Sequence, residues 1–315
     1  MVCAVPLNAF RRTLNAKLIP MNKTIIAMCL LSATLVQAQN LSAVKVGSRI
    51  DVTIDGAYFT SYRCAPDEKY PFFFPVNAPS GAGITSMRNG QFPHHSSLFF
   101  GCDRVNEGNY WQEGLDRGQI ISEGAELVVA KGKEIVITDV CNWKRPGAEQ
   151  PFKDTRKITI TAPSKTLRQI DFEVTVEALT NVEIKTTNHA FFSARVAPDI
   201  SVLYSNSLIN AEGKQTQKET SGIASTWMAA FGKRGNGKTE GIAILQHPTN
   251  ALIAQTKWLT RDYGFFSPTP FQWPEQKTGT SIKKGEKLNF RYRVFIFDGT
   301  PQSVQIAERY AEFSK

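Results

Sequence analysis

The sequence predicts an all-β protein, a large antiparallel β-sandwich with one short C-terminal helix. Apolar residues alternate with polar ones through most of the chain, as at Ile170, Phe172, Val174 and Val176. This period of two turns one face of each strand towards a core. Strands do not alternate with helices, which argues against a parallel βαβ sheet. We therefore expect about fifteen strands in a single sandwich domain, residues 39–315.

Turn signals rich in Gly, Pro, Asn and Asp divide the chain into these strands. The first half is expected to begin with a hairpin at 41–63 around Asp55-Gly56 and an edge strand at 69–76 between two prolines. A loop at 77–90 and a buried strand at 98–100 follow. We then expect strands at 119–143 and a hairpin at 155–179 that turns at 163–165. The second half is expected to contain a strand region at 182–204, a loop at 205–222, strands at 225–231 and 241–246, a strand at 288–297 and a helix at 301–313.

The only helical pattern follows Pro301, which suits a first helical turn. Val304, Ala307, Tyr310 and Phe313 then recur on one side at helical spacing. We interpret this stripe as a packing face.

Residues 1–38 are expected to be a leader that is removed. Lys23 precedes an apolar run at 25–36, and Val36-Gln37-Ala38 forms a small-residue cleavage pattern. These features are typical of a secretory signal peptide at about 21–38, with Met21 as the better start, and the run is too short to span a membrane. A transit segment is the alternative. We therefore expect a periplasmic or secreted protein.

Charge and cysteine usage exclude two classes of function. Without residues 1–38 the chain has 33 basic and 28 acidic residues, a net charge of +5. The basic residues are scattered, so nucleic-acid binding is not predicted. Cys64, Cys102 and Cys141 remain, without CxxC spacing, which disfavours a thiolate metal site. An oxidising compartment permits one disulfide among them, and buried free cysteines are the other interpretation.

The candidate site is predicted from the four histidines, each at a junction of loop and strand: His94, His95, His189 and His247. Imidazole is suited to proton transfer near neutral pH. His94 and His95 are adjacent, so an extended backbone points them to opposite faces, and we expect His95 to face the cavity and its neighbour to be structural. His247 precedes Pro248 and has an alternative role in fixing its loop.

Carboxylates, arginines and tryptophans complete the predicted site. Asp262 and Glu113 are the candidate acid or base. Arg195 and Arg261 are expected to grip a substrate through its carboxylate or hydroxyl groups, with ion pairing as the alternative. The tryptophans are candidates for stacking on a sugar ring, although core packing is the commoner fate of this residue: Trp111, Trp227 and Trp258.

The chain resembles a bacterial family known as PmoA-like, or "methane oxygenase PmoA". The matching segments follow the order of that family: Tyr70 to Pro75, Phe92 to His95, Asn106 to Glu113, His189 to Val196, Gly241 to Asn250, Trp258 to Gly264, and Arg291 to Gly299. The resemblance implies the wide β-sandwich (supersandwich) of galactose-mutarotase-like proteins. The name of the family does not imply methane oxidation here, because the sequence contains no membrane span and no thiolate cluster.

Together these features predict a periplasmic carbohydrate-active protein that performs acid and base chemistry on a sugar, as an epimerase, lyase or hydrolase. Its partner is a small molecule or oligosaccharide, and no cofactor is expected. One alternative is a non-catalytic sugar-binding or structural protein. The other is a divalent metal site on His94 or His95 with His189 and His247, which would suit Zn, Cu or Fe but has no HxH or HExxH spacing.

Overall fold

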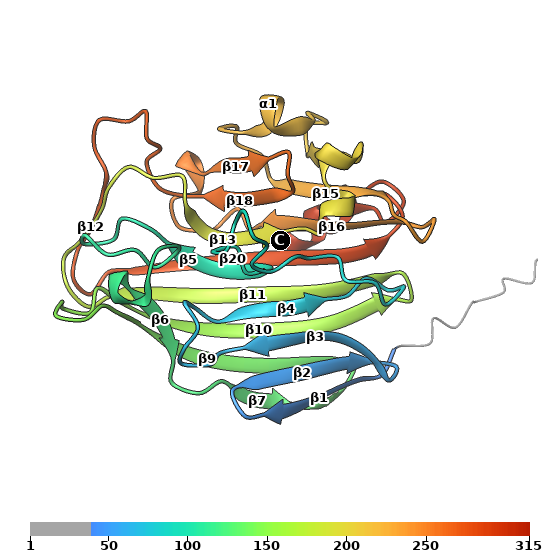
Figure 1. Ribbon diagram of the computed structural model, residues 1–315, viewed down its shortest axis with the longest axis horizontal. Helices are drawn as coiled ribbons and strands as arrows, with labels where there is room; N and C mark the ends of the chain where they lie inside the picture. Colours follow the sequence, from blue (N-terminus) through green and yellow to red (C-terminus); the bar gives the residue numbers. More distant parts are fainter. Residues whose placement is uncertain (1–38) are drawn as a thin grey trace, which may run out of the picture. The chain divides into compact units, whose positions relative to one another are not determined.

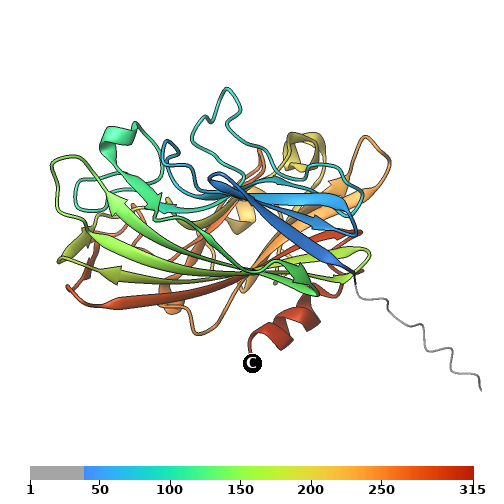
Figure 2. The same cartoon turned by 90° about the horizontal axis from the view of Figure 1, so that it is seen from below.

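Two antiparallel sheets of nine strands each lie face to face in the computed structural model, which describes residues 39–315 (Figures 1 and 2). The predicted all-β sandwich with a short C-terminal helix is confirmed. The described residues belong to one compact unit. The expected leader, residues 1–38 with its signal peptide, lies outside the described residues. No helix within 39–315 is long and apolar enough to cross a membrane.

The first sheet carries the loops that form the candidate site. Its strands are, in spatial order, β17 (Lys257–Arg261), β18 (Phe265–Thr269), β13 (Ala190–Arg195), β5 (Leu98–Cys102), β4 (Phe72–Val76), β3 (Ala57–Arg63), β2 (Arg49–Ile54), β1 (Leu41–Val46) and β8 (Lys131–Gly132).

The second sheet packs behind the first in the view of Figure 1. Its strands are, in spatial order, β14 (Ser207–Asn210), β15 (Trp227–Lys233), β16 (Thr239–Gln246), β20 (Lys287–Asp298), β11 (Leu167–Ala178), β10 (Phe152–Ser164), β9 (Glu134–Lys144) and β6 (Gln119–Ser122), with β7 (Glu126–Val129) also paired to β9. The remaining elements are the ribbon of β12 (Val182–Ile184) and β19 (Thr280–Ile282), the helices α1 (Thr216–Thr220) and α2 (Ile306–Phe313), and the short 3-10 helices η1 (Leu115–Arg117), η2 (Pro198–Ile200), η3 (Val202–Tyr204) and η4 (Ile253–Gln255).

Apolar side chains fill the space between the two sheets, as the alternation predicts. In β11, Ile170, Phe172, Val174 and Val176 are buried, and the residues between them are partly exposed. Each such side chain contributes roughly 1.5–3 kcal/mol when it is fully buried.

A polar network crosses this core and links the sheets. Asp154 and Arg156 are two apart in β10, so both point inward, and Arg156 Nε lies 2.7 Å from Asp154 Oδ1 with both side chains 0% exposed. Arg156 Nη1 donates to Tyr62 Oη of β3 in the first sheet, and Trp143 Nε1 of β9 donates to Asp154 Oδ2. Buried charges are tolerated in a core when they are paired and hydrogen-bonded in this way.

The C-terminal helix lies on the outer side of the second sheet (Figure 2). Phe313 of the helix forms a second apolar cluster with Trp227 and Phe295 of the sheet. The helix begins at Ile306, so the expected start at Pro301 is wrong. The reason is local: Gln305 has a positive φ of 57°, a left-handed conformation that interrupts the helix just before Ile306.

Two other expected elements also differ from the structure. The strand at 69–76 is not at an edge, because β4 lies between β3 and β5. Pro75 is accommodated because β4 pairs with β5 only at Phe72 and Phe73. The expected loop at 205–222 contains β14 and α1.

Candidate functional site

The pairing of β5 with β13 brings two distant side chains together. Cys102, the last residue of β5, lies opposite Ala190, the first residue of β13. The residues just beyond, Asp103 and His189, continue this register, and the Asp103 N–H donates to the His189 carbonyl at 3.2 Å. Both side chains therefore leave the same end of the strand pair.

Asp103 and His189 form a hydrogen-bonded dyad. His189 Nδ1 donates to Asp103 Oδ2 at 3.0 Å, and the Thr187 hydroxyl donates to the other carboxylate oxygen. The Asp103 side chain is 3% exposed, whereas that of His189 is 37% exposed. A carboxylate that holds Nδ1–H leaves Nε2 as the basic nitrogen of the neutral ring. The dyad can therefore accept a proton from a ligand at Nε2.

The loop after β5 folds back over that strand and forms a wall beside the dyad. Tyr110 N donates to Cys102 O at 2.9 Å. A Cβ on Gly101 would lie 2.6 Å from Tyr110 O, so this close approach requires glycine. Trp111 follows, and its ring centroid is 5.6 Å from that of His189. The buried Trp111 indole N–H has no hydrogen-bond partner in the described part of the chain.

His94 and His95 lie in a turn, not in an extended segment. His95 N donates to Phe92 O at 3.1 Å, which closes the turn around Pro93. The two imidazole centroids are 4.3 Å apart, so the expectation that the rings point to opposite faces is wrong. The Tyr70 hydroxyl fixes the turn by donating to His94 O at 2.5 Å.

The two histidines have opposite environments, and the expected assignment is reversed. His94 is half-buried and lines a cleft. Burial lowers its pKa, and the nearby charges of His189 and Arg195 lower it further. His95 is buried and stacks on Phe265 with ring centroids 4.4 Å apart. The structure therefore makes His94 the site residue and His95 the packing residue.

The buried His95 predicts a loss of stability in acid. Burial, with the charge of His94 next, lowers the pKa of His95 from 6.5 to about 2. Below pH 6.5 the unfolded chain binds a proton at this residue that the folded chain does not, so stability falls as the pH falls through this window. The loss between pH 7 and about pH 4.5 is about 2–3 kcal/mol.

The variant His95→Phe removes the imidazole that takes up a proton on unfolding, and it keeps an aromatic ring against Phe265. Urea denaturation of both proteins at pH 7 and pH 4.5 measures the effect. We expect the variant to lose about 2–3 kcal/mol less than the wild type on acidification. Parallel losses in the two proteins would contradict the assignment of His95 as a buried neutral residue.

Arg195, the last residue of β13, lies beside the histidines and has no carboxylate partner within residues 39–315. Its guanidinium carbon is 4.5 Å from the ring centroid of Tyr263 and 5.0 Å from that of Phe92. The residue is 4% exposed, and Nε and Nη1 are buried without hydrogen-bond partners in the described part of the chain. Burial lowers the pKa of Arg195, while the nearby Tyr263 has the opposite effect.

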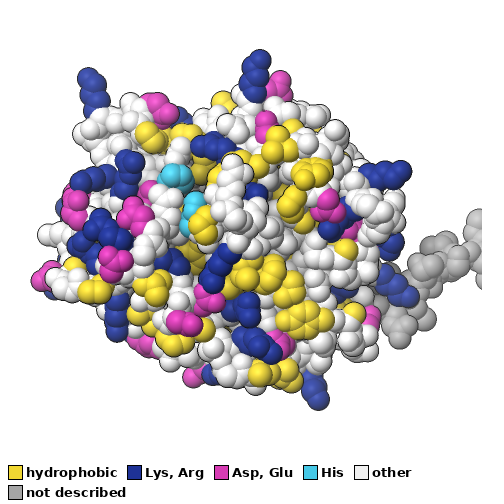
Figure 3. Space-filling view, in the orientation of Figure 1, with side chains coloured by type: hydrophobic (Ala, Val, Ile, Leu, Met, Phe, Trp, Pro, Cys, Tyr) yellow, Lys and Arg dark blue, Asp and Glu magenta, His cyan; other side chains and the backbone are white. Residues whose placement is uncertain are grey.

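A cleft of about 450 Å³ opens next to the dyad. Its lining includes His94, Trp111, Lys69 and Glu113. His94 and His189 are the partly exposed histidines, and Figure 3 shows the histidine surface as adjoining patches in a hollow of this face. Lys69 Nζ donates to Gly114 O at 2.9 Å, and burial lowers the pKa of Lys69 to about 8. His189 is not among the lining residues, but its ring lies against Trp111, which lines the cleft.

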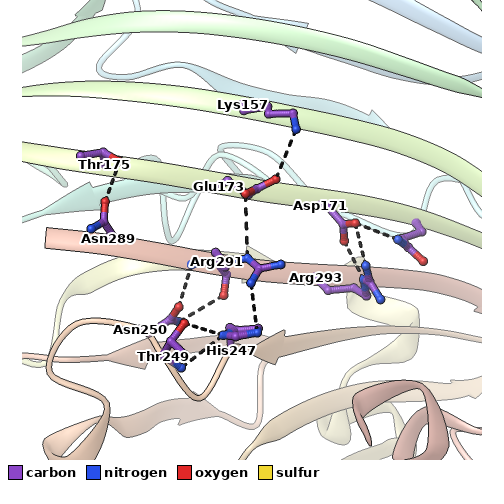
Figure 4. A network of polar contacts seen from close by, with 11 residues as sticks. Lys157, Asp171, Glu173, Thr175, His247, Thr249, Asn250, Asn289, Arg291 and Arg293 are labelled. Carbon is purple, nitrogen blue, oxygen red and sulfur yellow. Dashed lines mark hydrogen bonds and ion pairs between the residues drawn. The ribbon is translucent and has the colours of Figure 1, made fainter. Parts of the chain in front are cut away.

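His247 does not join the other three histidines. It lies on the outer face of the second sheet, where Arg291 Nη1 donates to its Nε2 at 3.1 Å (Figure 4). Its Nδ1 is 2.7 Å from the Thr249 hydroxyl, and its ring packs on Phe313 of α2. Burial and then the charge of Arg291 lower its pKa. His247 therefore fixes its loop, and the three-histidine metal site expected as an alternative is not assembled.

The described residues offer no other cluster for a metal. Within 39–315 no group of three or more His, Cys, Asp or Glu side chains is placed to hold an ion. The cysteines in this range are free and buried.

Asp262 and Arg261 were expected in the site but have structural partners elsewhere. Asp262 Oδ1 accepts from Gln217 N in the first turn of α1 at 2.7 Å. Arg261 Nη1 donates to Thr260 O at 2.9 Å and to Ser221 Oγ at 3.5 Å. These contacts join α1 to the turn after β17.

Glu113 and the remaining tryptophans also differ in their placement. Glu113 lies on the rim of the cleft in an exposed ion pair with Arg117, at 3.2 Å. Trp227 packs beneath α2. Trp258 is fully buried and donates from Nε1 to Ser225 O at 2.8 Å. Of the three tryptophans predicted to stack on a sugar, Trp111 alone is at the cleft.

The prediction from the sequence missed Asp103, the residue that orients His189. Asp103 directly follows a buried strand, as His189 directly precedes one. That position at a strand end is the one signal for Asp103 in the sequence. Pairing β5 with β13 is needed to see that the two residues meet.

The chain belongs to a family of unknown function, DUF6807, whose model matches residues 49–311. No curated protein matches the chain. Among solved structures, it is similar to the heparan sulfate lyase HepC from Pedobacter heparinus, in a mutant form with a TM-score of 0.32 and 12% identity. The other HepC structure gives a TM-score of 0.31 and 11% identity. Each comparison covers 80% of this chain and 30% of the lyase chain.

Proposed function

We propose that this protein transfers a proton to or from a carbohydrate bound over the exposed edge of His189, next to the cleft, with His189 as the general base. The observation that carries the proposal is the dyad: Asp103 is buried and holds Nδ1 of a partly exposed imidazole at 3.0 Å. A base oriented by a buried carboxylate is the arrangement that proton-transfer sites require. His94 lies near enough to His189 for the charge of the His189 ring to lower the pKa of His94, after the larger effect of burial.

The geometry favours proton transfer at carbon, as in an epimerase or lyase, over hydrolysis. Glycoside hydrolysis commonly uses two carboxylates that flank the bond to be cleaved. Of the two candidate carboxylates, Asp262 is bonded to α1 and Glu113 is ion-paired to Arg117. The Asp103 carboxylate already accepts a hydrogen bond from His189 Nδ1. The partly exposed His189 imidazole is therefore the group of the dyad that can exchange a proton with a ligand.

A sugar suits the composition of the cleft. Its wall combines the aromatic Trp111 with polar and charged side chains such as Gln112 and Lys69. Aromatic surface with a few convergent polar groups is common in ligand sites. The predicted likeness to galactose-mutarotase-like sandwiches, through the PmoA-like family, points to the same ligand class.

Solvent exchange tests the proposal even when the product has not been identified. The wild type is incubated in D₂O with a panel of neutral and acidic sugars and polysaccharides, and ¹H NMR follows loss of carbon-bound hydrogen. We expect loss of one carbon-bound hydrogen of the substrate, replaced by deuterium if the protein is an epimerase and accompanied by a new C=C bond and a departed leaving group if it is a lyase. Binding without exchange would favour a sugar-binding protein. Hydrolysis without exchange would contradict the proposed chemistry.

We also propose that the protein acts in the periplasm or outside the cell. The support is the signal-peptide pattern at about 21–38 in the sequence. Measuring the protein in periplasmic and cytoplasmic fractions tests this location, and a mature N-terminus near Gln39 is expected.

A further inference from the structure

Phe92 is a partly exposed aromatic residue in the turn that leads into His94. Its ring centroid lies 6.3 Å from that of His94, in an edge-to-face arrangement. The charge of His189 lowers the pKa of His94, after the larger effect of burial, so His94 is also near the proposed base. The ring of His189 itself packs on Trp111. Phe92 is therefore a second aromatic group beside the site, next to His94.

Two aromatic rings support Phe92, and both lie on the same face of it. Tyr263 stacks on Phe92 with ring centroids 4.2 Å apart, and His95 does so with centroids 5.2 Å apart. Stacked rings are separated by about 3.5 Å, so two rings on opposite faces of Phe92 would lie about 7 Å or more apart. The centroids of Tyr263 and His95 are only 6.1 Å apart. These two rings therefore lie side by side under one face of Phe92.

The supported face of Phe92 is its inner face. His95 is buried, and so is Arg195, whose guanidinium carbon lies 5.0 Å from the Phe92 ring centroid. The same carbon lies 4.5 Å from the ring centroid of Tyr263. Because these buried groups lie beneath Phe92, the exposure of its ring belongs to the opposite face. The structure thus presents one flat aromatic face to solvent beside His94.

Backbone hydrogen bonds hold this aromatic face in place. Phe92 N donates to Asn89 O at 2.9 Å and to Asn89 Oδ1 at 3.2 Å. Phe92 O accepts from His95 N at 3.1 Å, and His95 O accepts from Arg88 N at 2.8 Å. A ring that is already fixed in its turn and packed from below loses little rotamer freedom when a ligand covers it.

We propose that the outer face of Phe92 stacks on a sugar ring, and that the ligand is an oligosaccharide or polysaccharide of which another residue reaches His189. This inference rests on the proposed function, because it adds a subsite beside the same base and names a sugar chain as the substrate. One face of a pyranose ring carries mainly C–H groups, and the negative face of an aromatic ring attracts their positively polarised hydrogens. Burial of this apolar surface favours binding, and the fixed ring adds it at a small entropic cost.

Calorimetry with sugars of increasing length tests the inference. The protein is the His189→Ala variant, which keeps Phe92 and removes the proposed base. The probes are the monomer, dimer, trimer and tetramer of β-1,4-linked glucose, mannose and xylose and of α-1,4-linked galacturonate. We expect at least one series to bind about tenfold or more tightly as the tetramer than as the monomer, because the longer chain adds the contact with Phe92. Adding Phe92→Ala should reduce this gain to about threefold or less and leave the affinity for the monomer within about twofold.

Two further variants, made in the same His189→Ala background, separate stacking from a disturbed turn. Phe92→Trp keeps an aromatic face and should retain the gain in affinity. Its added indole should also shift the fluorescence emission to the blue when the tetramer binds, relative to the same titration of His189→Ala alone. Phe231→Ala removes a partly exposed phenylalanine from β15 in the second sheet, and this matched control should keep the full gain.

The outcomes separate this inference from the proposed function. Equal affinity for monomer and tetramer in every series, or no binding of any probe, would overturn the inference. A gain that survives Phe92→Ala, or one that Phe92→Trp loses as completely as Phe92→Ala, would also overturn it. If turnover requires His189 but affinity does not depend on chain length, the proposed function stands alone. If the gain depends on Phe92 but His189→Ala keeps full turnover, the inference stands and the proposed base is wrong.

Discussion

Asparagine in place of Asp103 is expected to lower kcat for the reaction at His189 by about 100-fold to 10,000-fold, the usual contribution of an oriented general base. The side chain is buried, and its carboxylate receives both His189 Nδ1–H and the Thr187 hydroxyl. An asparagine can present its amide N–H to Nδ1 instead, and the imidazole proton then moves to Nε2. The ring keeps its place but loses its basic nitrogen towards the ligand.

The pattern of kinetic changes distinguishes this role from a structural one. KM should change little, because Asp103 does not line the cleft. The double variant His189→Ala/Asp103→Asn should lose no more activity than His189→Ala alone, since the two residues act as a unit. Asp171→Asn is the matched control on the outer face of the second sheet, where Asp171 pairs with Arg293, and it should retain activity within about twofold. Additive losses would contradict the dyad.

Methionine in place of Arg156 is expected to lower the free energy of unfolding by about 3–5 kcal/mol, the usual cost of breaking a buried ion pair. Arg156 and Asp154 are both 0% exposed, so the substitution leaves a carboxylate in the core that has lost its cation. It also removes the donor that contacts Tyr62 in the facing sheet. Urea denaturation measures the change.

An exposed pair provides the control for this prediction. Lys287 and Glu177 lie 3.3 Å apart across β20 and β11, with side chains 58% and 41% exposed. Lys287→Met should therefore change the stability by about 1 kcal/mol or less. A similar loss in Arg156→Met and Lys287→Met would mean that the inner network does not hold the two sheets together.

The fold was predictable from the sequence because the features that indicate it, alternating apolar residues and turn residues, are local. The alternation in β10 and β11 and the short turn between them specify a hairpin, and the structure contains it. The helix start was not predictable, because nothing in the local sequence indicates that Gln305 adopts the left-handed conformation that separates Pro301 from the helix.

The site was only partly predictable because its key contacts are distant in sequence. His189 and Asp103 are separated by 86 positions and meet only through the pairing of β5 with β13. His94 and His95 were placed in extended backbone, but the turn at Pro93 brings both rings to one side. His247 lies at a strand end in the sequence, as His189 does, so the two could not be distinguished by position. Its strand belongs to the second sheet, where it contacts Arg291 on the outer face.

Comparing His189→Ala with His247→Gln in the D₂O exchange assay tests the central claim most directly. Both variants remove a histidine at a strand end, but one histidine belongs to the dyad and the other to the outer network. We expect exchange to fall by about 100-fold or more in His189→Ala and to stay within about twofold of the wild type in His247→Gln. Wild-type exchange in His189→Ala, or an equal loss in both variants, would contradict the assignment of His189 as the base.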